Sequence, residues 1–186
     1  MSEAAPELPG ELPAPRRLSA TLTGILVAGF KSFAEPVQVP VLPGLTGIVG
    51  PNGCGKTTLI NIITGYDSAT SGSIEVDGSR YGDDDWREVR KRVGLVASTL
   101  VTMLESSEPV LDVIASGRDA KLNLIEVVPA KIRAEARALL RRIGCTYLEN
   151  SLWGPLSQGE RQKVLICRAL MANFRVLILD EPCAGL

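Results

Sequence analysis

The sequence predicts an α/β domain in which a mostly parallel sheet is flanked by helices and carries a helical insertion. Three observations lead to this fold class. Short apolar runs with strand character alternate with segments of helical periodicity along the chain. The last apolar run, residues 176–179, is uninterrupted, which is typical of a parallel strand covered on both faces. Residues from about 100 to about 155 show a helical pattern and form the expected insertion.

The expected strands and helices follow one another from residue 21 onward. Apolar and β-branched runs predict strands at 22–27, 37–42, 46–49, 73–76, 93–97 and 176–179. Helical periodicity predicts helices at 56–64, from about 86, after 129 and from about 157. Gly65 and Gly144 suit the ends of two of these helices, because glycine readily adopts the left-handed conformation found there.

Residues 1 to about 18 have a different composition, with prolines and glutamates but few large apolar side chains. Such a segment buries too little apolar surface to fold, so we expect a disordered leader before a domain over 19–186. The 20 basic and 21 acidic residues nearly cancel, which argues against a dedicated nucleic-acid binder. No apolar run approaches the ~20 residues of a membrane span. We therefore expect a cytoplasmic protein that reaches the inner face of the membrane only through a partner.

A phosphate-binding loop is predicted between the strand at 46–49 and the helix at 56–64. The motif G-x-x-x-x-G-K-[ST] is matched by Gly50, Pro51, Asn52, Gly53, Cys54, Gly55, Lys56 and Thr57. The glycines let backbone N–H groups approach phosphate oxygens, and the helix N-terminus adds a positive dipole. Lys56 can reach the β- and γ-phosphates, and the Thr57 hydroxyl can ligate Mg²⁺. The motif therefore predicts a binder of a nucleoside triphosphate with Mg²⁺.

Two acidic residues follow the last expected strand. Asp180 would hold Mg²⁺ through water, and Glu181 would polarise the attacking water. Taken alone, the pair is also explained as solvated acids at a strand end. Together with the phosphate loop, the pattern indicates a metal-site role for Asp180 and a catalytic role for Glu181.

A third motif, LSQGE, occupies residues 156–160. Ser157 and Glu160 have the spacing of a capping box, which predicts the start of a helix. A Ser-x-Gly turn at a helix N-terminus is also suited to bind an anion. The residues expected to contact the nucleotide here are Ser157, Gln158, Gly159 and Glu160.

Taken in order, the segments GPNGCGKTT (50–58), LSQGE (156–160) and VLILDEP (176–182) resemble the ATP-binding cassette (ABC) ATPases. The resemblance extends over about residues 21–186. It implies that ATP and Mg²⁺ are the cofactors and that Thr58 belongs to the nucleotide site. It also implies a head-to-tail homodimer or heterodimer, in which Ser157 and Gly159 of one copy contact the γ-phosphate held by Lys56 of the other. In transporter-type cassettes, a membrane permease subunit is a further partner.

One position departs from the family pattern. The glutamine that the family places after the strand expected at 93–97 would fall near Ser98. A serine hydroxyl can approach Mg²⁺, but it reaches less far than a glutamine side chain. We therefore keep Ser98 as a metal-site residue, and a nucleotide-binding module without turnover as an alternative function.

Two branches of the family are represented along the chain. Residues 29–56 resemble the N-terminal head of SMC (structural maintenance of chromosomes) ATPases, which work on DNA. No heptad pattern of a coiled coil follows, and from residue 57 the sequence resembles transporter-type and related soluble cassettes. The resemblance therefore favours the ATP-binding subunit of an ABC transporter or a related soluble ABC ATPase. An SMC-like head fragment is the alternative.

The family pattern continues after the position of Leu186 with an aspartate, a helix, further strands and a switch histidine. The chain contains no histidine, which also excludes Ser-His-Asp triads and histidine-based zinc sites. We therefore expect an incomplete domain, which would bind ATP more weakly than a complete cassette and hydrolyse it slowly.

Overall fold

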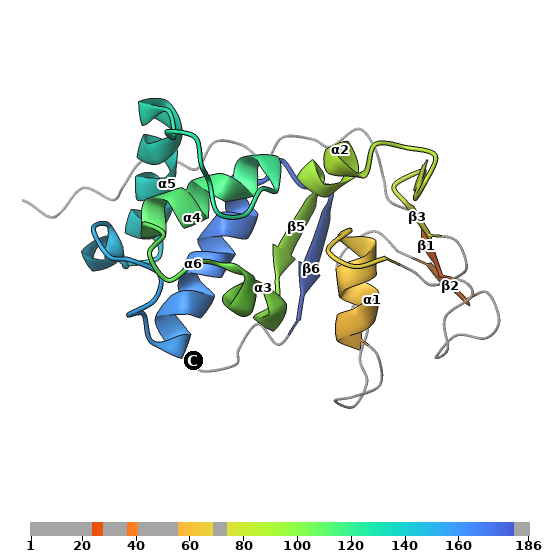
Figure 1. Cartoon of the computed structure of the whole chain (residues 1–186), viewed down its shortest axis with the longest axis horizontal. Helices are drawn as coiled ribbons and strands as arrows, with labels where there is room; N and C mark the ends of the chain where they lie inside the picture. Colours follow the sequence, from red (N-terminus) through yellow and green to blue (C-terminus); the bar gives the residue numbers. More distant parts are fainter. Residues whose placement is uncertain (1–23, 28–36, 41–55, 69–73, 181–186) are drawn as a thin grey trace, which may run out of the picture.

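Figure 1 shows the computed structural model, which describes residues 24–27, 37–40, 56–68 and 74–180. The predicted leader, the strand expected at 46–49, the loop residues 50–55 and Glu181 lie outside these ranges. Within them, helices and strands alternate as the sequence predicts.

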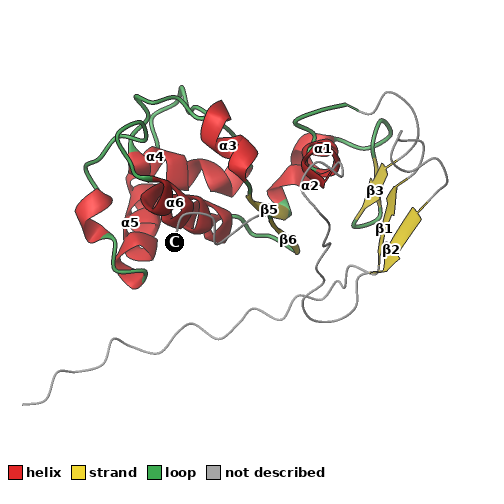
Figure 2. Ribbon diagram, turned by 90° about the horizontal axis from the view of Figure 1, so that it is seen from below, coloured by secondary structure: helices red, strands yellow, loops and turns green. Residues whose placement is uncertain are grey.

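A four-stranded sheet forms one side of the molecule (Figure 2). Its strands are β1 (Gly24–Val27), β2 (Val37–Pro40), β3 (Ile74–Val76) and β4 (Ser79–Arg80). The strand order is β2-β1-β3-β4, and every neighbouring pair is antiparallel. Asp77 and Gly78 join β3 to β4 with φ of 51° and 74°, as in a two-residue hairpin turn. Such a turn permits only antiparallel pairing of the two strands that it joins. The hydrophobic pattern of the sequence did not distinguish this antiparallel sheet from a parallel one.

The second sheet contains β5 (Val93–Val96) and β6 (Val176–Leu179), which are parallel as predicted. Their register places Val96 opposite Leu179. Every residue of β5 is buried, whereas Leu177 and Leu179 of β6 expose 36% and 43% of their surface. β6 is therefore less completely covered than its uninterrupted apolar run predicts.

Helices α1 (Lys56–Ile63) and α2 (Trp86–Lys91) lie between the two sheets (Figures 1 and 2). Asp85 caps α2 by accepting a hydrogen bond from a backbone amide of the first turn. Gly65 follows α1 with φ of 68°, which confirms the predicted helix end. A Cβ at Gly65 would lie 2.4 Å from Trp86 Cδ1, so the close packing of α2 on α1 also requires glycine there.

The remaining helices gather on the other side of β5 and β6 (Figure 1). They are α3 (Ser98–Met103), α4 (Val110–Ala115), α5 (Ala130–Arg142) and α6 (Gln158–Met171), with the 3-10 turns η1 (Ser116–Asp119) and η2 (Thr146–Leu148). α6 packs against β5, α4 and α5 and is the central helix of this group. Gly144 follows α5 with φ of 70°, which confirms the second predicted helix end.

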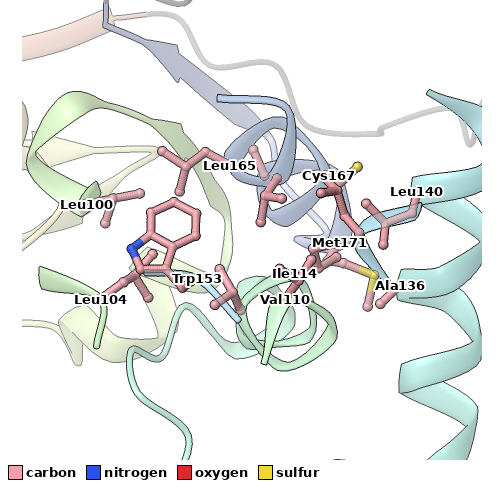
Figure 3. Packing of buried hydrophobic residues seen from close by; sticks show 14 of the residues in the cluster. Leu100, Leu104, Val110, Ile114, Ala136, Leu140, Trp153, Leu165, Cys167 and Met171 are labelled. Atoms are coloured by element: carbon pink, nitrogen blue, oxygen red, sulfur yellow. The ribbon is translucent and has the colours of Figure 1, made fainter. Parts of the chain in front are cut away.

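The main hydrophobic core lies among these helices (Figure 3). The indole ring of Trp153, which is 1% exposed, lies beside Leu100 and Leu104. Burying a large apolar side chain stabilises the fold by about 1.5–3 kcal/mol, so this cluster is the main support of α6. A second cluster, built from α1, α2, β3 and the first residues of β5 and β6, fills the space between the two sheets.

Candidate functional site

The carboxyl ends of β5 and β6 bring together two of the predicted metal-site residues. Because the strands are parallel, the chain leaves both of them at the same edge of the sheet. Ser98 is the first residue of α3, just after β5, and it is exposed. Asp180 directly follows β6 and is 8% exposed, and its amide donates to the Val96 carbonyl at 2.8 Å. Ser98 and Asp180 therefore share one edge, the position at which ligands bind in open α/β sheets.

The start of α1 is the next component of this region. The helix begins at Lys56, and its first turn contains no acidic residue. Thr57 and Thr58 are exposed in that turn. A helix N-terminus without a carboxylate of its own offers N–H groups and a positive dipole to an external anion. The predicted loop residues 50–55 lie outside the described residues, so their contacts stay a prediction.

α6 begins with the predicted capping box. Ser157 is the N-cap, and its Oγ accepts a hydrogen bond from the Glu160 amide at 3.4 Å. The Glu160 carboxylate accepts hydrogen bonds from the Ser157 amide at 2.9 Å and from the Ser157 hydroxyl at 2.7 Å. Ser157 and Gln158 are exposed, and Gly159 and Glu160 are partly exposed, so an external ligand can reach this turn. In Figure 1, this end of α6 lies on the same side of the molecule as α3 and the start of α1.

A negative charge occupies the N-terminus of α6. The hydrogen bond from the Ser157 hydroxyl, followed by that from the Ser157 amide, lowers the pKa of Glu160, and the Tyr147 hydroxyl adds to the effect. The pKa of Tyr147 is raised, first by desolvation and then by the neighbouring Cys145 and Glu160. The carboxylate complements the helix dipole, which is also what attracts a phosphate to such a helix end. No local sequence pattern indicates Tyr147, because its contact with Glu160 depends on tertiary packing.

Arg161 holds the segment before Ser157 against α6, a role that the sequence motifs did not predict. Its Nη2 donates to the Gly154 carbonyl at 2.6 Å, and its guanidinium lies 5.5 Å from the centre of the Trp153 ring. The second contact is a cation–π interaction. Because Trp153 is fixed in the core, Arg161 positions the turn that carries Ser157. The Trp-Gly pair directly before the motif is the signal that could have indicated this support.

A groove of about 620 Å³ lies between α2 and residues 119–126. We call residues 119–126 the outer wall of this groove. Charged side chains line both sides of it, among them Arg87, Arg90, Asp119 and Lys121. Ile125 of the outer wall is fully exposed. Ser98, Asp180 and Ser157 are not among its lining residues, so the groove is a second surface, distinct from the edge of the sheet.

The oxygen donors at the edge of the sheet and at the start of α1 suit one kind of metal. Within 24–27, 37–40, 56–68 and 74–180, no group of three or more His, Cys, Asp or Glu side chains could hold a metal ion by itself. Thr57, Ser98 and Asp180 offer hydroxyl and carboxylate oxygens. Mg²⁺ prefers oxygen ligands and usually completes its shell with water and substrate phosphates. The donor set therefore fits Mg²⁺ that arrives with a nucleotide.

Within 24–27, 37–40, 56–68 and 74–180, no helix has both the length and the apolar character needed to cross a membrane.

Two features together define the class of this domain. The parallel strands β5 and β6 end at an edge that carries Ser98 and Asp180, and α1 starts at the lysine and threonine of a G-x-x-x-x-G-K-[ST] motif. This arrangement is that of a P-loop nucleoside-triphosphate-binding domain. The family described as ABC transporter matches residues 42–184, and the chain belongs to this family. The resemblance drawn from the three sequence motifs is thereby confirmed.

Several ATP-binding proteins of ABC transporters are similar to the chain. It is 38% identical over 140 residues to the ABC transporter ATP-binding protein YlmA of Bacillus subtilis, covering 75% of this chain and 53% of that protein. It is 37% identical over 156 residues to the zinc uptake system ATP-binding protein ZurA of Listeria monocytogenes, covering 81% and 58%. The ADP conformation of an ATP-binding cassette of an ABC transporter aligns with a TM-score of 0.63 at 26% identity, covering 89% and 69%. The chain thus spans little more than half the length of these curated relatives.

Proposed function

We propose that this protein is the ATP-binding subunit of an ABC transporter and that it binds ATP with Mg²⁺ where α1, β5 and β6 meet. The observation that carries the proposal is the placement of Asp180 and Ser98 at one edge of the sheet. Membership of the ABC transporter family supports ATP as the nucleotide. The exposed first turn of α1 supports phosphate binding next to that edge.

Each residue of this site has a separate proposed role. Residues 50–55 and Lys56 bind the phosphates, and Thr58 belongs to the same contact. Thr57, Asp180 and Ser98 would hold Mg²⁺, directly or through water, and the ion would supply positive charge to the phosphates. Glu181 accepts a proton from the attacking water as the general base.

A second copy or a related subunit would complete the site. In this arrangement, Ser157 and Gly159 at the start of α6 donate hydrogen bonds to the γ-phosphate bound by the partner, and Gln158 borders the same contact. The Ser157 hydroxyl now donates to Glu160, so it has to turn away from this carboxylate to donate to a phosphate. Closure of the dimer would therefore exchange an internal hydrogen bond for one to ATP.

The groove between α2 and the outer wall is the proposed docking surface for a membrane permease subunit. Its mixed charges and the fully exposed Ile125 suit a cytoplasmic segment that presents both polar and apolar side chains. Replacing Ile125 by glutamate should prevent co-purification with a co-expressed permease and leave ATP binding unchanged. Undiminished co-purification would locate the permease elsewhere.

A nucleotide-binding module without turnover is the second candidate function. Ser98 favours it, because its short side chain stands where the family has a glutamine. Phosphate release separates the two candidates. ATP-dependent release that Glu181→Gln abolishes supports the hydrolytic function, whereas binding without any release supports the module.

Titration calorimetry with ATP tests the nucleotide site itself. We expect tighter binding with Mg²⁺ than with a chelator, and we expect Asp180→Asn to remove most of this difference. Glu75→Gln is a matched control, because Glu75 is exposed on β3 and lies in the antiparallel sheet. Binding that is absent, or that is equally strong without Mg²⁺, would contradict the proposal.

A further inference from the structure

Arg168 connects α6 to the outer wall of the groove. The residue is 3% exposed, and its Nε donates to the Ser116 hydroxyl at 3.1 Å. Its Nη2 donates to the Lys121 carbonyl, in the outer wall, at 2.8 Å. Ser116 is itself fixed, because its hydroxyl donates to the Val113 carbonyl at 2.7 Å. A buried guanidinium is costly, and here its planar fork joins three separate elements of the fold.

Hydrogen bonds at Asn123 and Leu124 fix the backbone of the outer wall. Asn123 has φ of 51°, and its Nδ2 donates to the Met103 carbonyl at 2.9 Å. Its Oδ1 accepts a hydrogen bond from the Glu105 amide at 3.0 Å. The Leu124 amide donates to the Glu108 carboxylate at 3.1 Å. These hydrogen bonds tie the wall to α3 and to the segment between α3 and α4.

The backbone of α6 also touches η1 directly. A Cβ at Gly117 would lie 2.0 Å from the Arg168 carbonyl oxygen, so the two backbones are in contact. α6 is one uninterrupted helix over Gln158–Met171. At about 1.5 Å per residue, Arg168 lies about 16 Å along the helix from Ser157. A rigid secondary-structure element can carry coupling between its two ends, so a shift at Arg168 would change the position of Ser157.

We infer that Arg168 is a positioning residue that couples occupation of the groove to the placement of Ser157 at the start of α6. The inference rests on the proposed function, since it deepens the roles given there to the groove and to Ser157. A segment docked in the groove pushes on the outer wall, the Lys121 carbonyl carries the displacement to Arg168, and α6 carries it to Ser157. The permease would thereby influence how closely Ser157 approaches the γ-phosphate.

A double-mutant cycle read by amide hydrogen exchange tests this coupling in the full chain, without ATP or a partner. Asn123→Gly removes the two side-chain hydrogen bonds of Asn123 and so loosens the outer wall, while glycine still adopts the positive φ. The exchange rate of the Arg161 amide reports how stable the first turn of α6 is. That amide donates to the Ser157 carbonyl at 2.9 Å. We expect Asn123→Gly to speed its exchange about two- to thirtyfold in the parent and not at all in an Arg168→Met background.

A conservative variant and a matched control separate positioning from general stability. Arg168→Lys keeps one donor within reach of the Lys121 carbonyl and should restore part of the coupling. Arg133→Met removes an arginine of α5 that pairs with Asp112, so the coupling should persist in it. If Arg168→Met does not fold, as judged by circular dichroism, Arg168→Gln replaces it, because its shorter side chain cannot span both the Ser116 hydroxyl and the Lys121 carbonyl.

Two results would overturn the inference. In the first, Asn123→Gly speeds exchange of the Leu124 amide and leaves the Arg161 amide unchanged in the parent. In the second, it speeds exchange of the Arg161 amide equally in both backgrounds. ATP binding is measured separately, so coupling without ATP binding would contradict the proposed function alone, and ATP binding without coupling would contradict the inference alone.

Discussion

The N-termini of α1 and α6 are both predicted to meet phosphate, and they are prepared for it in opposite ways. The first turn of α1 contains no acidic residue and exposes Thr57 and Thr58. The first turn of α6 contains Glu160, whose carboxylate accepts hydrogen bonds from both the amide and the hydroxyl of Ser157. One helix end is thus open to an external anion, whereas the other already holds an anion of its own.

This difference explains how two similar helix ends can serve different steps. An open N-terminus binds an anion without first giving up a contact, which suits the helix that captures ATP within one chain. A capped N-terminus is stable without a ligand, and it has to exchange an internal hydrogen bond to accept one. α6 should therefore contribute little to ATP binding by a single copy and act when a second copy closes on it.

The largest expected effect is at α1. Lys56→Ala should weaken ATP binding about 10- to 150-fold, because it removes a charge-assisted contact to phosphate. Titration calorimetry measures the change. Lys131→Ala is the control, since Lys131 is exposed on α5, and it should bind ATP like the parent. An equal loss in both variants would show that the effect is only one of overall charge.

The next effect concerns the support beneath α6. Arg161→Met should lower the free energy of unfolding by about 1–2 kcal/mol, because the Gly154 carbonyl loses a charged donor on a partly exposed site. Urea denaturation followed by circular dichroism measures it. Arg142→Met removes an exposed arginine from the last turn of α5 and should change stability by less than about 0.5 kcal/mol. Equal stability of the two variants would mean that Arg161 does not support the turn.

A matched pair of hydroxyl deletions contrasts the two helix ends directly. Ser157→Ala removes the N-cap of α6 and should cost about 1 kcal/mol of unfolding free energy. Thr57→Ala should leave the unfolding free energy within about 0.5 kcal/mol, because the residue is exposed. The order should reverse for Mg²⁺-dependent ATP binding by the single chain, where only Thr57→Ala causes a loss. If the same variant had the larger effect on both unfolding free energy and ATP binding, the two helix ends would not differ in role.

The smallest effect is a pH dependence of the α6 cap. Because Ser157 lowers the pKa of Glu160, the folded value lies below the ordinary 4.5. The contribution of the charged cap is therefore present in full above that pH and is lost as the pH falls through the folded value. Glu160→Gln keeps the capping geometry without the charge. The parent should therefore have a higher free energy of unfolding than this variant at neutral pH, and the difference should shrink as the pH is lowered. A stability difference that is independent of pH would contradict the assignment.

Local patterns predicted the helix ends well, because the residues that form them are neighbours in the sequence. The capping box of Ser157 and Glu160 and the ends at Gly65 and Gly144 are confirmed. Each depends on contacts within about one turn. The placement of Ser98 and Asp180 after strands was predicted in the same local way, because each residue directly follows an apolar run in the sequence.

Contacts between distant segments were not predicted. Arg168 donates to the Lys121 carbonyl, 47 residues earlier in the chain, and nothing in either local sequence indicates the pairing. The partnership of Tyr147 with Glu160 likewise joins residues of two separate elements, η2 and α6. The antiparallel pairing of β1 with β3 also joins separate parts of the chain, with α1 between them in the sequence. Periodicity detects which side of an element is buried, but it does not identify the partner that covers it.

The most direct test of the central claim separates ATP capture by α1 from dimer closure by α6. ATP binding and ATP-dependent dimerisation are measured by calorimetry and light scattering in a Glu181→Gln background, with Lys56→Ala or Ser157→Ala added. We predict that the Lys56 variant loses both properties, whereas the Ser157 variant binds ATP as a single chain and does not dimerise. A Ser157 variant that dimerises normally, or that loses ATP affinity as the Lys56 variant does, would contradict the different roles of the two helix ends.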